Sequence, residues 1–518
     1  MGIPSFYKRL LTVHKGLVTK QRAATVAALY LDFNCLIYYC VRRPGILPYE
    51  SANHDTWESS LLGEITKYVS QLWREAGQPP EVFLAIDGVV PLAKIKQQRL
   101  RRFKSVWLSQ EERTLGIRIG SSWDTNCITP GTLFMERLGL ALKTLCSKHS
   151  GWSVSDAAEP GEGEQKVMTR LREKKAGDSV IIYGLDADLI LLSLLNGKAK
   201  DISVSLMRED TEFGLKGESY SYLSVDVLAE SLWSDFVSLS ALRKQQRIQN
   251  YVAGMSLLGN DFLPHSLSIK VREDGHERLA SDLLELESEH NSIQLLTQVG
   301  DYQEVSREAL FMLFEKWSKE EESLICHSLK KKFQMKGRVN LSDPAAVLSS
   351  RPLEWAVEKE VLLINKNSDG KSQWSLKPSW RSVYHEKWMN DVDIDTACSQ
   401  YIYGIQWIYD YYTGQRPVDL FWMYPVSLPP LWSDLFLFRN KPCTVEPTVR
   451  TPLLPQEQLA LVLPLDSWHF VRDKRLRELP YKYPQFWCKG FSFFSVGRSM
   501  LWECEANIPF FPVSRLYA

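Results

Sequence analysis

The chain has 518 residues with 62 basic and 62 acidic side chains, and 44% of its residues are hydrophobic. That length allows a large core and two or more domains, and the balanced charge argues against a broad electrostatic grip on nucleic acid but not against a local basic channel. The spacing of its nine cysteines fits neither a zinc site nor a disulfide framework and indicates reduced thiols inside a cell, and no apolar run is long enough to span a membrane.

Three apolar segments in the N-terminal part of the chain have the composition of buried parallel strands, and each runs into aspartate. They are Ala27–Leu31 before Asp32, Val82–Ile86 before Asp87, and Ser179–Tyr183 before Asp186 and Asp188. Helix-like stretches separate them, at Leu61–Arg74, Leu133–Cys146 and Lys166–Lys174. This alternation predicts an α/β fold with a doubly wound, mostly parallel sheet flanked by helices, and an active site at the carboxyl ends of the strands.

A basic segment, Lys94–Lys104, follows the second of these strands. In a helix, four of its polar side chains would share one face, because they are spaced at i, i+4, i+7 and i+8. They are Lys94, Gln98, Arg101 and Arg102. Three cations and an amide on one stripe can bind a phosphate group by charge and by forked hydrogen bonds. A solvated basic helix is the alternative, and the nearby strand-end carboxylate Asp87 favours phosphoryl chemistry.

Further carboxylates occur in two glycine-containing turns, Pro160–Glu164 and Gly259–Pro264. With the strand-end aspartates they give one set: Asp32, Asp87, Glu162, Glu164, Asp186, Asp188 and Asp261. Each alone is more simply explained as a helix cap or a turn former. Clustered at one edge of a sheet, they would repel one another unless divalent cations neutralised them, and carboxylate oxygens suit Mg²⁺ or Mn²⁺. Two such ions about 4 Å apart would cleave phosphodiesters without a side-chain nucleophile.

The remainder of the chain is predicted to be mainly helical. Ser266–Lys359 is charged and helix-like, Asn365–Gln373 indicates a surface loop, and Tyr401–Tyr412 indicates an aromatic-rich helix. Many of the seventeen tryptophans lie in the C-terminal third, where they could stack on bases, although most are better explained as core residues.

Together these motifs resemble those of the XRN family of 5′→3′ exoribonucleases. The matching stretches in the N-terminal half are Met1–Pro4, Tyr30–Asn34, Ala85–Val89, Pro91–Lys104, Asn126–Met135, Pro160–Glu164, Tyr183–Asp188 and Gly259–Pro264. A looser match continues through Trp380–Trp388, Tyr403–Ile408, Tyr411–Gly414, Trp422–Pro425, Trp502–Glu503 and Pro509–Phe511. The resemblance therefore covers nearly the whole chain.

The resemblance implies a PIN/FEN-like nuclease domain over residues 1–350, closed off by a mainly helical, aromatic-rich second region over residues 351–518. It implies that the seven carboxylates bind two Mg²⁺ ions, for which Mn²⁺ can substitute. It also implies that a 5′-monophosphate is held by Lys94, Gln98, Arg101 and Arg102. Base stacking would fall to Tyr38 and Trp422, which would make the threading of RNA tolerant of sequence.

On this resemblance we expect a processive hydrolase that degrades 5′-monophosphorylated single-stranded RNA, decapped or cleaved, and releases nucleoside 5′-monophosphates in mRNA decay. A capped or triphosphorylated end would be too large or too charged for the pocket. The expected partners are this RNA and a decapping enzyme, without a membrane. We expect a monomer in the cytoplasm, with the nucleus as the alternative. The chain stops where the second region stops, which is typical of a minimal family member from a virus or a compact genome.

Three positions depart from the family pattern. Tyr38 stands where the family has a stacking histidine, and Leu420 replaces one of two tryptophans in the segment that ends at Trp422. Both changes bear on translocation and processivity. Gln249–Asn250 replaces an acidic pair that lies outside the ligand set.

Two other functions would use a similar acidic sheet edge. A flap-type, structure-specific DNA nuclease would need neither the phosphate-binding helix nor the second region. A non-catalytic RNA-binding module would have little use for so many like charges. Both stay open as alternatives to the exoribonuclease.

Overall fold

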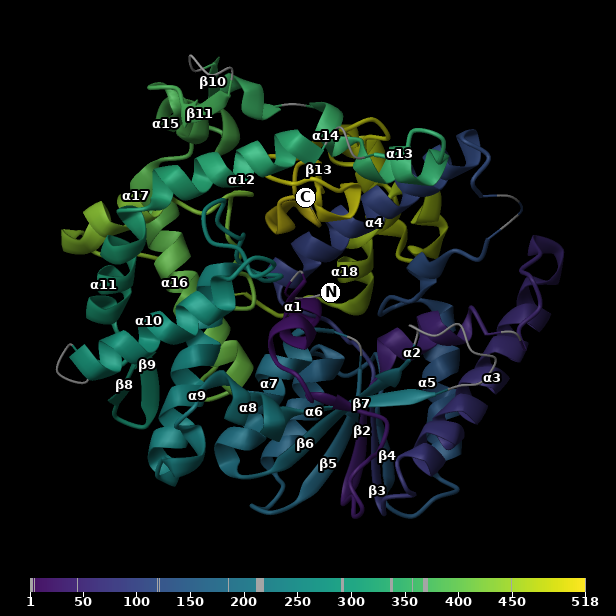
Figure 1. Ribbon diagram of the computed structural model, residues 1–518. Coiled ribbons are helices and arrows are strands. Elements are labelled where there is room, and N and C mark those ends of the chain that lie inside the picture. The colour runs from purple at the N-terminus through teal and green to yellow at the C-terminus, as the bar shows by residue number, and fades with distance from the viewer. Residues whose placement is uncertain are drawn as a thin grey trace.

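The computed structural model describes residues 3, 5–43, 45–118, 120, 122–184, 186–210, 219–289, 293–335, 339–355, 357–366, 371–448 and 450–517. A seven-stranded sheet forms the base of the molecule, in the order β1-β7-β6-β5-β2-β3-β4 (Figure 1). Its strands are β1 Val18–Thr19, β2 Ala28–Asp32, β3 Glu81–Ala85, β4 Trp152–Ser155, β5 Ser179–Tyr183, β6 Ser203–Glu209 and β7 Tyr220–Ser224.

The central strands of this sheet are parallel. The pairs β2·β3, β2·β5, β3·β4 and β5·β6 run in the same direction, whereas β6·β7 and β1·β7 are antiparallel. The predicted mostly parallel sheet is therefore confirmed. All five residues of β2 are buried, as expected for a strand covered on both faces. Strands β3 and β4 lie on one side of β2, and the later strands β5 and β6 lie on its other side, so the direction of the strand order reverses at β2. A crevice is expected at the carboxyl end of β2, where this reversal occurs.

Helices of the N-terminal part cover both faces of the sheet, while α4 lies away from it among C-terminal elements (Figure 1). Their bounds are α1 Phe6–Val13, α2 Phe33–Cys40, α3 His54–Glu75, α4 Leu92–Thr114, α5 Leu133–Cys146, α6 Gly163–Arg172, α7 Asp188–Asn196 and α8 Val225–Leu232. Along β2 the side chains alternate: Tyr30 packs into the core with α6 and α7, while Leu29 and Leu31 pack with α2, α3 and α5.

The rest of the chain is mainly helical, as predicted. Its helices are α9 Ala241–Met255, α10 Gly275–Glu289, α11 Arg307–Ser318, α12 Glu321–Met335, α13 Pro344–Ser350, α14 Pro352–Trp355, α15 Trp380–Ser382, α16 Ile394–Thr413, α17 Trp432–Leu437, α18 Pro455–Val462, α19 Lys474–Arg477 and α20 Leu479–Lys482. In the described part of the chain, none of the helices is both long and apolar enough to cross a membrane.

Three small antiparallel pairs interrupt these helices. They are β8 Leu296–Val299 with β9 Tyr302–Val305, β10 Leu362–Lys366 with β11 Ser372–Leu376, and β12 Ser492–Phe494 with β13 Glu505–Asn507. The prediction that Asn365–Gln373 is a surface loop is wrong at both ends of the segment. Asn365 and Gln373 pair with each other in the β10·β11 ladder. This pairing could not be predicted from the polar composition, because the two strands are largely exposed and do not alternate apolar with polar residues. Residues 367–370 of that stretch lie outside the described residues.

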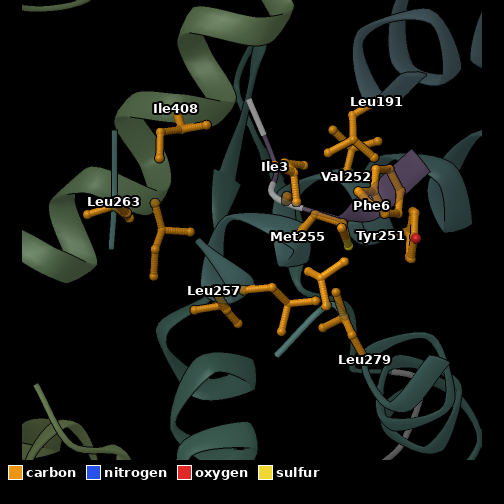
Figure 2. Close-up of a cluster of buried hydrophobic side chains, with 14 of the residues drawn as sticks. Ile3, Phe6, Leu191, Tyr251, Val252, Met255, Leu257, Leu263, Leu279 and Ile408 are labelled. Carbon is orange, nitrogen blue, oxygen red and sulfur yellow. The ribbon is translucent and has the colours of Figure 1, made fainter. Parts of the chain in front are cut away.

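One continuous core joins the sheet to the helical half. Figure 2 shows a part of it where α1, α7, α9 and α16 meet, with Phe6, Leu191, Tyr251 and Ile408 among the labelled side chains. The helix α1 is therefore part of a core that it shares with helices from both halves of the chain.

The basic helix α4 is surrounded by the C-terminal segment (Figure 1). It packs on α18 and β13, and its apolar side shares a core cluster with residues of the segment 453–516. The guanidinium of Arg99, fully buried, donates to the carbonyls of Leu461 (2.7 Å) and Phe486. A buried charge requires such partners, so α4 depends on the C-terminal segment for its environment.

Candidate active site

A cavity of about 690 Å³ lies at the carboxyl ends of β2 and β3. Most of the predicted site residues line it: Asp32, Asp87, Glu162, Glu164, Asp186, Lys94, Gln98, Arg101, Arg102 and Tyr38. The lining carboxylates form what we call the acidic wall: Asp32, Asp87, Glu162, Glu164 and Asp186. Asp188 and Asp261 do not line the cavity but lie next to this wall, because Lys94 contacts Asp261 and the Asp261 carboxylate interacts with Asp188. The cavity thus joins carboxylates from the strand ends to cations from α4.

A glycine lets the acidic residues come together. The backbone N–H of Gly163 donates to Asp87 Oδ1 at 2.7 Å, which fixes the start of α6 over the end of β3. A Cβ at this position would lie 2.8 Å from Asp32 Oδ1 and 2.7 Å from the Ala85 carbonyl oxygen. Only glycine permits this approach, and the neighbouring Glu162 and Glu164 are brought to the site by it.

The acidic wall is electrostatically strained. Burial, reinforced by the Asp87 carboxylate, raises the pKa of Asp32 well above its usual range. Burial also raises the pKa of Glu164 well above its usual range, and burial together with Asp261 raises the pKa of Asp188 to about 7. The buried atoms Glu164 Oε1 and Asp188 Oδ1 have no hydrogen-bond partner. Unpaired buried acceptors of this kind are satisfied by a proton or by a cation.

Lys94 is bound to these carboxylates in this structure. Its Nζ lies 2.5 Å from Glu162 Oε2 and 2.9 Å from Asp261 Oδ2. Although burial alone would lower it, the pKa of Lys94 is raised well above its usual range by the Asp261 and Glu162 carboxylates. The helical spacing correctly placed Lys94 on the cavity, but its ammonium is engaged by the acidic wall rather than by the basic end.

A second contact to the acidic wall comes from the helical half. The hydroxyl of Tyr411, on α16, donates to Glu162 Oε1 at 2.7 Å. The sequence reasoning quoted Tyr411 only as part of a motif and gave it no role. Its place could not be predicted, because nothing in the local pattern says that α16 reaches the strand ends.

The carboxylates fit a divalent cation by chemistry, since they offer hard oxygen donors, two of which are unpaired. Across the ranges described above, however, no three or more His, Cys, Asp or Glu side chains are arranged closely enough to hold a metal ion. The ammonium of Lys94 between Glu162 and Asp261 accounts for the open arrangement, because it supplies positive charge where a cation would lie.

Replacement of Lys94 by methionine tests this account. Because it leaves buried carboxylates without a counter-charge, we expect the free energy of unfolding in EDTA to fall by about 3 kcal/mol. Mg²⁺ should then raise the melting temperature of Lys94→Met more than that of the native protein, as measured by thermal unfolding. The control is Lys96→Met on the same helix, whose ammonium donates to the Tyr424 carbonyl, and its melting temperature should respond to Mg²⁺ no more than that of the native protein. Equal stability of Lys94→Met and native protein in EDTA would contradict the account.

The basic end of the cavity is formed by α4. Arg102 is fixed by bonds to Asn126 Oδ1 (2.9 Å) and the Ile128 carbonyl (3.3 Å). Among the described residues, Arg101 has no hydrogen-bond or ion-pair partner, and the buried Gln98 Oε1 has no hydrogen-bond partner. A free guanidinium beside a fixed one, with an amide next to them, is suited to a phosphate group.

The aromatic residues correct one sequence-based assignment. Tyr38 lines the cavity and is 38% exposed, so it has a face available for stacking. Trp422 is only 4% exposed; it packs beside Trp407 and its indole N–H donates to Gln400 Oε1 at 2.8 Å. A buried indole has no face for an entering base, so Trp422 is a core residue here.

In contrast to Trp422, Trp502 is an exposed tryptophan at the cavity. It lines the cavity and is 55% exposed. Lys104 Nζ donates to its carbonyl at 2.9 Å and to the Cys504 carbonyl at 2.6 Å, which ties this segment to α4. Sequence reasoning named Trp502 only within a matching stretch, because one tryptophan among seventeen carries no local sign of exposure.

Comparison with known proteins adds to this geometry. Residues 1–210 match the family model described as the XRN 5′-3′ exonuclease N-terminus. The chain is 27% identical to "5′-3′ exoribonuclease 1" of Homo sapiens, over 100% of this chain and 34% of that protein. It is 32% identical to "5′-3′ exoribonuclease 2" of Yarrowia lipolytica over 47% of this chain and 29% of that protein. The exoribonuclease 1 of Schizosaccharomyces pombe is 29% identical over 53% of this chain and 23% of that protein.

These relatives are much longer than the chain, which spans about a third of the length of the first two curated relatives. The resemblance that the motifs indicated is confirmed by the match and by the relatives.

Proposed function

We propose that the chain is a 5′→3′ exoribonuclease acting on single-stranded RNA with a 5′-monophosphate, because its residues 1–210 match the model of the XRN 5′-3′ exonuclease N-terminus. We also propose a PIN/FEN-like fold for this part of the chain, which its mostly parallel seven-stranded sheet supports. The observation that carries the proposal is a single cavity with carboxylates at one end and free phosphate-binding groups at the other. Such a cavity can hold a terminal phosphate and the next phosphodiester at the same time.

The basic end would fix the RNA terminus. Arg101 and Gln98 would bind the 5′-phosphate, while Arg102, held by Asn126, forms a rigid wall behind it. Anchoring the terminus places the first phosphodiester at the acidic wall, which is the positional contribution to catalysis. A triphosphate or cap would add charge and bulk beyond this wall, so we propose that both are excluded.

The acidic end would supply the chemistry. Two Mg²⁺ ions, with Mn²⁺ able to substitute, would be held by Asp32, Asp87, Glu162, Glu164, Asp186, Asp188 and Asp261. Bound there, the ions would provide Lewis-acid stabilisation of the reacting phosphate and a nucleophilic water. Tyr411 would orient Glu162 through its hydrogen bond, and Lys94 would be released from the carboxylates toward the phosphate end. The products would be nucleoside 5′-monophosphates.

The cellular role follows from the proposed substrate. A 5′-monophosphate is left by decapping or internal cleavage, so we place the protein in mRNA decay with a decapping enzyme as partner. It would act as a monomer in the cytoplasm, with the nucleus as the alternative.

Digestion of one RNA carrying a 5′-monophosphate, a 5′-triphosphate or a 5′-hydroxyl, labelled at its 3′ end, tests the proposal. With Mg²⁺ we expect only the monophosphorylated RNA to disappear, without intermediate lengths. Intact RNA together with cleavage of a flapped DNA duplex would instead support a flap-type nuclease.

Trp502 is expected to stack on an RNA base at the cavity mouth. Stacking on an aromatic side chain contributes about 1–3 kcal/mol per base. We therefore expect Trp502→Ala to weaken RNA binding by roughly tenfold and to produce intermediate lengths in the digestion, and Trp502→Phe to restore most of the binding. Fluorescence anisotropy with EDTA present measures the affinity. Trp422→Phe is the matched control, and an effect on RNA affinity from Trp422→Phe but none from Trp502→Ala would reverse our assignment.

A further inference from the structure

A second, smaller cavity lies behind the segment that carries Trp502. It has a volume of about 60 Å³ and is enclosed between the residues that follow Asp261 and the C-terminal segment. Its polar lining residues are Ser5, His265, Lys270, Arg272, Arg498 and Glu503. The sequence analysis gave none of these six a role in binding.

Lys270 is the unusual member of this lining. It is only 5% exposed, and its Nζ donates to Ser328 Oγ at 2.6 Å and to the Gly497 carbonyl at 3.2 Å. Both partners are neutral, and among the described residues no carboxylate lies within ion-pair distance of Nζ. A buried ammonium without an opposite charge is costly, and burial, with the nearby Arg272, lowers the pKa of Lys270 to about 7.

Two arginines add further positive charge to the cavity. Arg498, 4% exposed, uses Nη1 for both of its hydrogen bonds, to the Glu503 carbonyl (2.6 Å) and to Glu505 Oε1 (3.0 Å). Within the described chain this leaves Nε and Nη2 of Arg498 as available donors. Arg272 Nη1 lies 2.6 Å from Glu503 Oε1.

The lining carboxylate, Glu503, compensates Arg272 but forms no ion pair with Lys270. Glu503 Oε1 is taken by Arg272, and Oε2 accepts from the backbone N–H groups of Ser499 (2.8 Å) and Met500 (2.9 Å). Burial, together with the positive charges of Arg498 and Lys270, lowers the pKa of the partly buried His265 well below the usual range. Three cations therefore line this cavity. Arg272 is paired with Glu503 and Arg498 with Glu505, whereas Lys270 has no carboxylate partner among the described residues.

We propose that this cavity is a binding site for a phosphate-sized oxyanion, held by Lys270, Arg498 and Arg272. The anion would give Lys270 the counter-charge that its protein partners do not supply, and the free guanidinium donors of Arg498 would bind its oxygens. The volume admits a phosphate group but not a nucleoside. The inference stands apart from the proposed nuclease function, because it uses other residues and another cavity.

Occupancy of this site would act on the larger cavity through Trp502. Arg272 belongs to the segment after Asp261, and Arg498 to the segment that turns back through Met500 to Trp502. An anion between them would bind these two segments together. It would thereby hold Trp502 at the mouth of the larger cavity.

Thermal unfolding during a titration with inorganic phosphate tests the site, in EDTA and at constant ionic strength maintained with chloride. Phosphate should raise the melting temperature of the native protein by a few degrees, since a ligand that binds only the folded state stabilises it. The Lys270→Met protein should lose this shift. Lys270→Gln, which keeps a donor for Ser328 or Gly497, is the second variant in case the first does not fold.

Two controls separate this site from the larger cavity and from net charge. Arg101→Ala removes a phosphate-binding group of the larger cavity and should keep most of the shift. Lys331→Met removes the same charge from the exposed face of α12 and should keep all of it. A parallel titration with adenosine 5′-monophosphate identifies the source: we expect the shift that depends on Lys270 with inorganic phosphate alone, because the cavity has no room for the nucleoside. The proposal is overturned if the native protein shows no shift, if Lys270→Met retains it, or if Arg101→Ala abolishes it.

Discussion

A protein in which Asp188 is replaced by asparagine is expected to bind 5′-monophosphorylated RNA with near-native affinity and to cleave it at least roughly a thousandfold more slowly. Asp188 is buried, its Oδ1 has no partner, and its carboxylate neighbours that of Asp261. The amide keeps the shape of the side chain but removes the charge that a divalent cation requires. A loss of about 4 kcal/mol of transition-state stabilisation corresponds to three factors of ten in rate.

Single-turnover cleavage of 5′-monophosphorylated RNA with Mg²⁺ measures this loss, and anisotropy with EDTA measures binding. The matched control is Asp156→Asn. Asp156 also follows a strand of the sheet, but it pairs with Lys143 at 2.5 Å and lies outside the cavity lining, so its replacement should leave turnover within about twofold. Native turnover by Asp188→Asn would refute the assignment of the acidic wall as the catalytic centre.

Replacement of Arg101 by alanine should remove the preference for a 5′-monophosphate. Arg101 lines the cavity and has no partner among the described residues, so its guanidinium is available to the phosphate. A hydrogen bond to a charged group contributes about 1.5–3 kcal/mol, so kcat/KM on the monophosphorylated RNA should fall by about 10- to 100-fold. Turnover of the 5′-hydroxyl RNA should not change, because that terminus offers Arg101 nothing to bind.

Competition between the two RNAs in one reaction measures the preference directly. Arg113→Ala on the same helix is the control, because the exposed side chain of Arg113 makes, among the described residues, a single long contact, to Ser122 Oγ (3.4 Å). An unchanged preference in Arg101→Ala would move the phosphate site to another part of the cavity.

The parts of the fold that could be predicted are those with a strong local pattern. The strand β5 has the predicted bounds Ser179–Tyr183, and α5 the predicted bounds Leu133–Cys146, because each is a continuous apolar or amphipathic run between clear breaks. The β10·β11 ladder was missed, since its exposed strands have no such pattern. The order of the strands could not be predicted either, because it depends on which helices cover which face.

The same limit applies within the site. Helical spacing placed Gln98, Arg101 and Arg102 on the cavity, because a backbone periodicity decides which face they share. It could not show that the ammonium of Lys94 binds the acidic wall, since the reach of a long side chain is decided by the charges around it. Nor could it distinguish buried Trp422 from exposed Trp502, because both are tryptophans in aromatic-rich stretches.

The buried Arg99 has a consequence for the synthesis of the protein. The residue is 362 positions ahead of Leu461, the first of the two carbonyl groups that hold it in α4. At translation rates of about 5–20 residues per second, roughly 20–70 seconds pass between the emergence of the helix and that of its partner. From the time that Asp261 has been synthesised until Leu461 follows, the nascent chain contains every proposed catalytic carboxylate but has no settled position for the helix that is proposed to bind the RNA terminus. We therefore expect the activity to begin only after Leu461 and Phe486 have been synthesised, which would spare RNA near the ribosome that is making the protein.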